Sequence, residues 1–128
     1  MTIELYCLLF STVLGFLHVM TQVVTQARER KTPYDPNRDN PVVLGLYGGR
    51  AQRALQNFLE TYPLFIAAIV VLTFVEEEGF ISNLGAMLYL GARTAYLPLY
   101  IAGLGPIRSI AWGLSLLGLV LLFLTPLV

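Results

Sequence analysis

The sequence predicts an all-α integral membrane protein, a bundle of four transmembrane helices. Of its 128 residues 56% are hydrophobic and 12% are charged, which is too apolar a composition for a soluble domain of this length. Four apolar windows each reach the roughly 20 residues that a helix needs to cross a hydrocarbon core about 30 Å thick. These windows are residues 3–26, 57–75, 81–102 and 107–128, and we expect them to form a single membrane domain.

The elements follow in order from these windows. The first is expected to remain in the mature protein, because it lacks the basic start and the cleavage site of a signal peptide. Residues 27–49 are rich in proline and glycine, so we expect one long loop there. Residues 50–56 are compatible with helix, so the second helix should begin before the membrane. A hinge at residues 103–106 joins the last two windows, with Pro106 suited to the first turn of a helix.

The distribution of charge predicts the orientation in the membrane. All eight Lys and Arg residues lie between the end of the first window and the start of the fourth. The turn between the second and third windows instead carries Glu76, Glu77 and Glu78 and no base. By the positive-inside rule, the basic loop faces the cytosol. Both termini then face the opposite side of a bacterial inner membrane or of the endoplasmic reticulum.

Strongly polar side chains recur within the apolar windows, where each costs about 2.5 to 3.5 kcal/mol at the centre of a helix unless it is paired. In the second and third helices they follow one another at intervals of three or four residues, so each set projects from one helical face. In the fourth helix they occupy the first turn, where free N–H groups favour an anion. These residues are Arg50, Arg53, Asn57 and Glu60 in the second helix, Tyr89, Arg93, Tyr96 and Tyr100 in the third, and Arg108 and Ser109 in the fourth.

We expect five arginines, Glu60, Asn57 and two or three of the tyrosines to line one crevice where the cytosolic ends of the helices meet. Arginines there outnumber the single acid, Glu60, and an excess of buried positive charge calls for an anionic ligand. An alternative remains open, in which Glu60 neutralises one arginine and the others extend to the cytosolic surface.

The first window carries a weaker polar stripe. Glu4, Ser11, His18, Gln22 and Thr25 fall on one helical face, which should therefore face protein and contribute to helix packing or to contacts between subunits. We expect packing, not catalysis, for His18. The one cysteine, at position 7, is expected to be buried and inert. No ligand spacing predicts a metal site.

The run RAQRALQNFLETYPLF at residues 50–65 resembles the signature of the MAPEG family, the membrane-associated proteins of eicosanoid and glutathione metabolism. Arg93 with Tyr96 and Tyr100 resembles the third-helix site of that family, and the PIRS run at residues 106–109 resembles its prostaglandin synthase branch. Arg28 resembles the arginine that reaches the site from a neighbouring subunit. The resemblance covers residues 22–109.

The resemblance implies a homotrimer of four-helix protomers with glutathione held between adjacent subunits. The implied activity is that of a membrane-bound glutathione transferase or peroxidase, whose thiolate attacks a lipophilic electrophile or hydroperoxide arriving through the lipid. The expected roles are glutathione binding by Arg28, Arg50, Arg53, Asn57, Arg93, Tyr96 and Tyr100, binding of its ammonium group by Glu60, stabilisation of the thiolate by Arg108, and a hydrogen bond to sulfur or a capping role for Ser109.

The sequence also departs from the family pattern. Leu55 stands where the prostaglandin synthase and microsomal transferase branches carry His, and Thr61 stands where the leukotriene synthase branch carries Tyr. Neither eicosanoid specificity is therefore predicted. Two other functions remain as alternatives, a non-catalytic lipid-binding scaffold of the same family and a small multidrug transporter. The transporter would need an acid deep in the first span, whereas Glu4 lies at its start. We expect no nucleic-acid partner.

Overall fold

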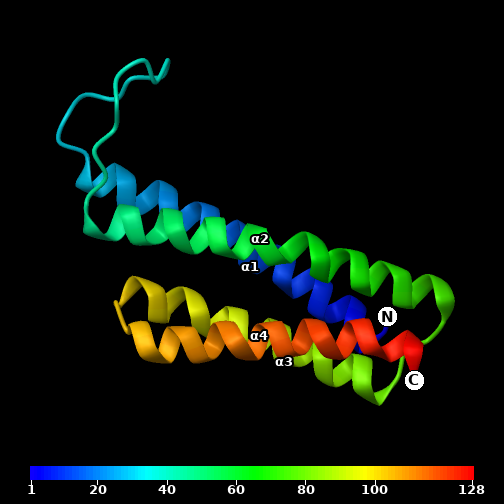
Figure 1. The fold of residues 1–128 in the computed structure, drawn as a ribbon. Coiled ribbons are helices and arrows are strands. Elements are labelled where there is room, and N and C mark those ends of the chain that lie inside the picture. The colour runs from blue at the N-terminus through cyan, green and yellow to red at the C-terminus, as the bar shows by residue number, and fades with distance from the viewer.

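The computed structural model describes residues 1–128 as four helices that pair into two hairpins (Figure 1). Helices α1 and α2 form one layer, and α3 and α4 form the other. Both termini lie at one end with the turn between α2 and α3, while the long loop and the turn between α3 and α4 lie at the other end. The elements are α1 (Ile3–Glu29), α2 (Leu46–Val75), α3 (Phe80–Ile101), α4 (Gly105–Leu124) and a terminal 3-10 helix, η1 (Thr125–Leu127).

The long loop is shorter than its composition predicts, because α1 continues to Glu29 and α2 begins at Leu46. The Glu29 carboxylate accepts hydrogen bonds from the backbone N–H groups of Tyr47 and Gly48, at 2.9 Å each. It therefore caps the first turn of α2, whose own N-cap residue, Gly45, has no side chain to do so. A side chain on Gly45 would collide with this carboxylate.

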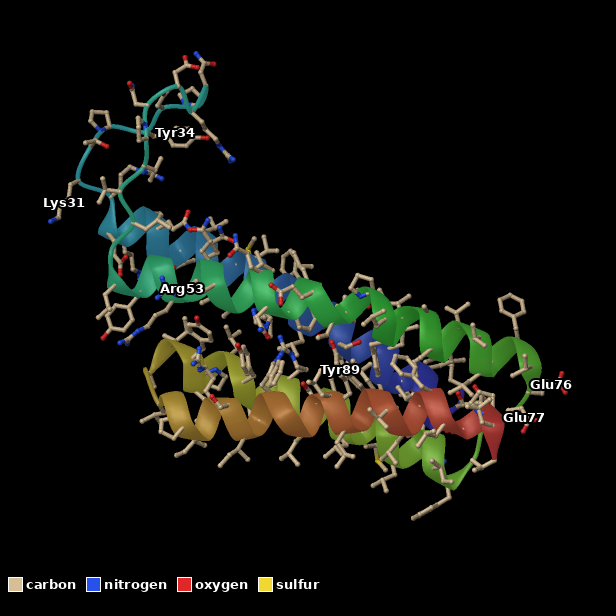
Figure 2. All side chains as sticks on the ribbon, viewed as in Figure 1. Lys31, Tyr34, Arg53, Glu76, Glu77 and Tyr89 are labelled. Atoms are coloured by element: carbon tan, nitrogen blue, oxygen red, sulfur yellow. The ribbon has the colours of Figure 1, made fainter.

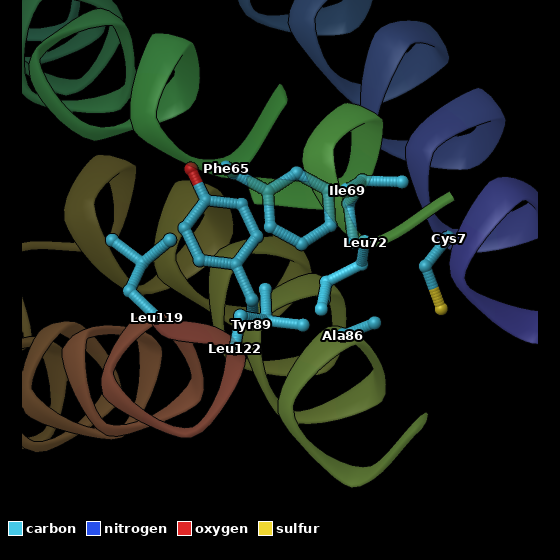
Figure 3. Close-up of a cluster of buried hydrophobic side chains, with 8 residues drawn as sticks. All are labelled: Cys7, Phe65, Ile69, Leu72, Ala86, Tyr89, Leu119 and Leu122. Carbon is cyan, nitrogen blue, oxygen red and sulfur yellow. The ribbon is translucent and has the colours of Figure 1, made fainter. Parts of the chain in front are cut away.

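A hydrophobic core fills the bundle (Figure 3). The rings of Phe65 from α2 and Tyr89 from α3 are stacked at its centre, with their centroids 4.2 Å apart. Cys7 lies at the edge of this cluster, only 5% exposed, so its predicted burial is confirmed. The cluster consists of Cys7, Phe65, Ile69, Leu72, Ala86, Tyr89, Leu119 and Leu122.

The outer surface of the bundle is apolar, as lipid contact requires. Only 26 of the 128 residues are buried, and large side chains such as Phe10, Phe16 and Phe74 point outward. Helices α1 and α2 and the segment Gly105–Leu127 are each long and apolar enough to cross a membrane. Helix α3 is not among them, so the prediction that it also crosses the membrane, which would give four spans in all, stays a prediction.

The polar stripe of α1 faces protein along its first part, whereas Gln22 and Thr25 are only half-buried and the Thr25 hydroxyl donates to the carbonyl oxygen of Thr21 in the same helix. Glu4, Ser11 and His18 are at most 1% exposed. The Glu4 carboxylate and the Ser82 hydroxyl of α3 form a hydrogen bond, and the Ser11 hydroxyl donates to the Tyr62 hydroxyl at 3.2 Å.

Close packing of α3 against α4 depends on two glycines. A Cβ atom added at Gly118 would lie 2.7 Å from the carbonyl oxygen of Gly85 and 2.8 Å from the backbone nitrogen of Tyr89. The two backbones are thus almost in contact, as small residues allow in membrane bundles.

We therefore expect Gly118→Ala to destabilise the bundle by about 1 to 3 kcal/mol, because the added methyl group must separate α3 from α4. Thermal unfolding in detergent measures this change. Gly113→Ala on the same helix is the matched control, since a Cβ atom there meets nothing within 4 Å. Equal melting temperatures for the two variants would contradict the close packing.

Candidate functional site

Basic side chains concentrate at the loop end of the molecule, whereas the turn at the far end carries acidic side chains and no base (Figure 2). Arg53 lies at the loop end of α2, and Lys31 lies on the loop itself, while Glu76 and Glu77 lie in the turn at the far end. The separation that the sequence shows along the chain is therefore also a separation in space.

One cavity at the loop end, of about 230 Å³, lies between the start of α2 and the turn from α3 to α4. Three guanidinium groups and no carboxylate line it, together with one tyrosine and two glycines. Tyr100 connects two of the arginines, because its hydroxyl accepts a hydrogen bond from Arg53 Nε at 3.2 Å and its ring centroid lies 4.4 Å from Arg108 Cζ. The lining residues are Arg50, Arg53, Tyr100, Gly103, Gly105 and Arg108.

A smaller cavity of about 150 Å³ lies against α4. Its lining is more neutral, with Arg108 as the one charged group, and Arg108 therefore borders both cavities. Trp112 was missed in the sequence analysis, although it follows Arg108 by four residues and so shares its helical face. The lining residues are Asn57, Tyr96, Arg108, Ser109 and Trp112.

Arg93 is completely buried behind this smaller cavity, with 0% of its surface exposed. Its Nη1 atom donates to Asn57 Oδ1 at 2.9 Å, and its Cζ atom lies 4.3 Å from the ring centroid of Tyr96. Its Nε and Nη2 atoms have no hydrogen-bond partner. A buried guanidinium without a carboxylate is unfavourable, which makes an anion close to this wall favourable.

Two of the predicted residues make backbone contacts. The Ser109 hydroxyl donates to the carbonyl oxygen of Gly105 at 3.1 Å, within the first turn of α4. Arg50 Nη1 donates to the carbonyl oxygen of Ile101 at 3.0 Å, at the end of α3. Both side chains still line a cavity.

The remaining predicted residues line neither cavity, and one of them, Tyr89, is instead buried in the hydrophobic core with its hydroxyl hydrogen-bonded to that of Thr61 at 3.0 Å. Glu60 is exposed on α2 and makes no direct ion pair, although its charge acts on the buried Arg93 from a distance, so it compensates that arginine only in part. Arg28 is exposed in the last turn of α1. The single crevice expected from the sequence is thus two cavities that meet at Arg108, with Arg93 behind one of them.

His18 lies near this region but outside both cavities. Its ring is stacked on Phe58 with the centroids 4.7 Å apart, and neither ring nitrogen has a hydrogen-bond partner. The structure contains no group of three or more His, Cys, Asp or Glu side chains that could hold a metal ion.

The arrangement suits a ligand that carries negative charge at one part and an apolar group at another. The larger cavity offers guanidinium groups to carboxylates, and the smaller one offers aromatic surface from Tyr96 and Trp112. Arg108 stands in the first turn of α4, where the helix dipole adds to its charge. An anionic atom held at the border between the cavities would be stabilised by both.

Comparison with known proteins agrees with the resemblance drawn from the motifs. The model of the MAPEG family matches residues 5–128, nearly the whole chain. No curated protein matches the chain, and no solved structure does. With three helices apolar enough to cross a bilayer, the chain is an integral membrane protein that belongs to the MAPEG family, the membrane-associated proteins of eicosanoid and glutathione metabolism.

Proposed function

We propose that the protein is a membrane-bound glutathione transferase or peroxidase that stabilises the glutathione thiolate for attack on lipophilic electrophiles or hydroperoxides. The observation that carries the proposal is the position of Arg108, which borders a cavity rich in arginine on one side and an aromatic cavity on the other. Family membership supports glutathione as the cosubstrate.

Glutathione carries two carboxylates, one ammonium group and a thiol, and the site offers partners for each. Arg50 and Arg53, with Arg93 behind the wall, supply positive charge for the carboxylates. Asn57, Tyr96 and Tyr100 supply hydrogen-bonding groups for the peptide units, and Glu60 is free to receive the ammonium group.

A second copy of the chain would complete the site. Each cavity is smaller than the about 300 to 1,000 Å³ typical of ligand pockets. Arg28 and Glu60 are exposed and reach neither cavity of their own chain. A homotrimer that places glutathione between subunits would bring Arg28 of one protomer to the cavities of the next.

In the proposed reaction Arg108 faces the glutathione sulfur. A free thiol has a pKa of about 8.5, and a guanidinium beside a helix N-terminus lowers it because both favour the thiolate. In conjugation the sulfur forms a bond to the electrophilic carbon as the leaving group departs with its electron pair. With a hydroperoxide, sulfur attacks the terminal oxygen and releases an alcohol, and a second glutathione then converts the sulfenic acid to disulfide and water.

Ser109 lies next to Arg108 on the same cavity wall. Its hydroxyl donates to the carbonyl oxygen of Gly105, so a hydrogen bond to the sulfur would replace that bond. We propose that the site opens toward the cytosol, with the termini on the opposite side of the membrane, because the basic loop lies at the same end as the cavities.

We expect Arg108→Ala to raise the pKa of the bound glutathione thiol toward its free value and to lower turnover with an aryl halide by roughly 100-fold. Thiolate absorbance as a function of pH measures the first effect. Arg30→Ala is the matched control, because Arg30 lies on the loop against Tyr34, at 5.0 Å from its ring. An unchanged thiol pKa with unchanged turnover would remove Arg108 from the mechanism, and glutathione binding without any turnover would favour the scaffold.

We expect the detergent-purified protein to have the mass of a trimer. Arg28→Ala should then weaken glutathione binding by about tenfold, through loss of one charged hydrogen bond, although Arg28 touches neither cavity in its own chain. Lys31→Ala provides the control, since Lys31 lies on the exposed loop. A stable monomer that binds glutathione equally well with and without Arg28 would rule out an intersubunit site.

A further inference from the structure

The side chain of Arg50, on α2, contacts the turn between α3 and α4. Gly103 in this turn has a φ angle of +76°, in the left-handed region that favours glycine. A Cβ atom there would lie 2.8 Å from Arg50 Nη2 and 3.0 Å from both Cζ and Nη1. The Arg50 guanidinium therefore rests directly against the backbone of the turn.

The hydrogen bond of Arg50 satisfies a carbonyl group that the turn leaves free. The backbone N–H groups that follow α3 donate elsewhere, from Ala102 to Pro98, from Gly103 to Tyr100 and from Leu104 to Leu99. The carbonyl of Ile101 receives Arg50 Nη1 instead, at 3.0 Å. A cation at the C-terminus of a helix is also favoured by the helix dipole.

The conformation of this turn determines the position of the first turn of α4. The N–H group of Arg108 donates to the carbonyl oxygen of Leu104, the residue that follows Gly103, at 2.9 Å. A second contact from α2, between Arg53 and Tyr100, holds the last turn of α3. Arg50 and Arg53 thus attach α2 to the segment that carries Arg108.

We infer that Arg50 is a positioning residue, which holds the α3–α4 turn through Ile101 and Gly103 and thereby places Arg108 at the border of the two cavities. The inference rests on the proposed function, in which Arg108 faces the thiolate. This role is additional to the positive charge that Arg50 supplies for a carboxylate. The two roles are separable, because Gly103 contributes to the first and has no side chain for the second.

Gly103→Ala tests the inference while it retains every arginine. The added methyl group would displace the Arg50 guanidinium, so we expect the thiol pKa of bound glutathione to rise and kcat to fall by about tenfold or more. The affinity for S-methylglutathione, which keeps both carboxylates but cannot ionise at sulfur, should stay nearly unchanged. Gly91→Ala is the control, because a Cβ atom at that exposed position of α3 meets nothing within 4 Å.

Two further variants keep the test informative if Gly103→Ala folds poorly. Arg50→Lys retains the charge but not the flat guanidinium, so it should raise the thiol pKa of bound glutathione even where its affinity for S-methylglutathione falls only slightly. Arg50→Ala should make the effect of Gly103→Ala smaller when the two are combined, since both remove the same contact. If Arg50→Ala weakens S-methylglutathione binding, leaves the thiol pKa unchanged and adds independently to Gly103→Ala, the inference is overturned.

Trp112 provides a measurement that needs no glutathione. It is the one tryptophan of the chain and lies one helical turn beyond Arg108. We expect its fluorescence emission in the ligand-free protein to shift in Arg50→Lys and Gly103→Ala and to stay constant in Gly91→Ala. Unshifted emission together with an unchanged thiol pKa would contradict the positioning role and leave the proposed function intact. Shifted emission in a protein that binds no glutathione would support the positioning role and refute the proposed function.

Discussion

Uncompensated positive charge at one end of an apolar bundle is the constraint on which the site depends. Arg93 is fully buried with two unpaired nitrogens, and Arg108 borders two cavities that contain no carboxylate. Removing a charge from water costs several kcal/mol, which a partner of opposite charge offsets. Asn57, the ring of Tyr96 and the more distant charge of Glu60 compensate Arg93 only in part. An anionic ligand is therefore the natural complement of this end of the molecule.

At the opposite end of the bundle, two acidic side chains, Glu4 and Glu78, have hydrogen-bond partners within the chain. There the buried Glu4 is hydrogen-bonded to Ser82, and the Glu78 carboxylate accepts hydrogen bonds from the hydroxyls of Thr2, at 3.1 Å, and Thr73, at 3.0 Å. These acids have partners within the chain. The contrast between these paired acids and the unpaired nitrogens of Arg93 is the reason we propose the binding site at the loop end.

Hydropathy and helical spacing predicted much of the architecture, because both depend on local sequence alone. They predicted the helices, the buried stripe of Glu4, Ser11 and His18, and the gathering of polar side chains from three helices. They did not predict that Glu29 caps α2 or that Arg50 holds the α3–α4 turn, since both contacts join segments far apart in the chain. The division of one expected crevice into two cavities likewise depends on how the helices meet.

The most direct test of this account is calorimetric comparison of glutathione with its diethyl ester, in which both carboxylates are blocked, on the purified wild-type protein. We predict that glutathione binds and that the ester binds at least about tenfold more weakly, because the arginines lose their charged partners. Equal affinity for the two compounds would show that the excess positive charge does not hold the ligand.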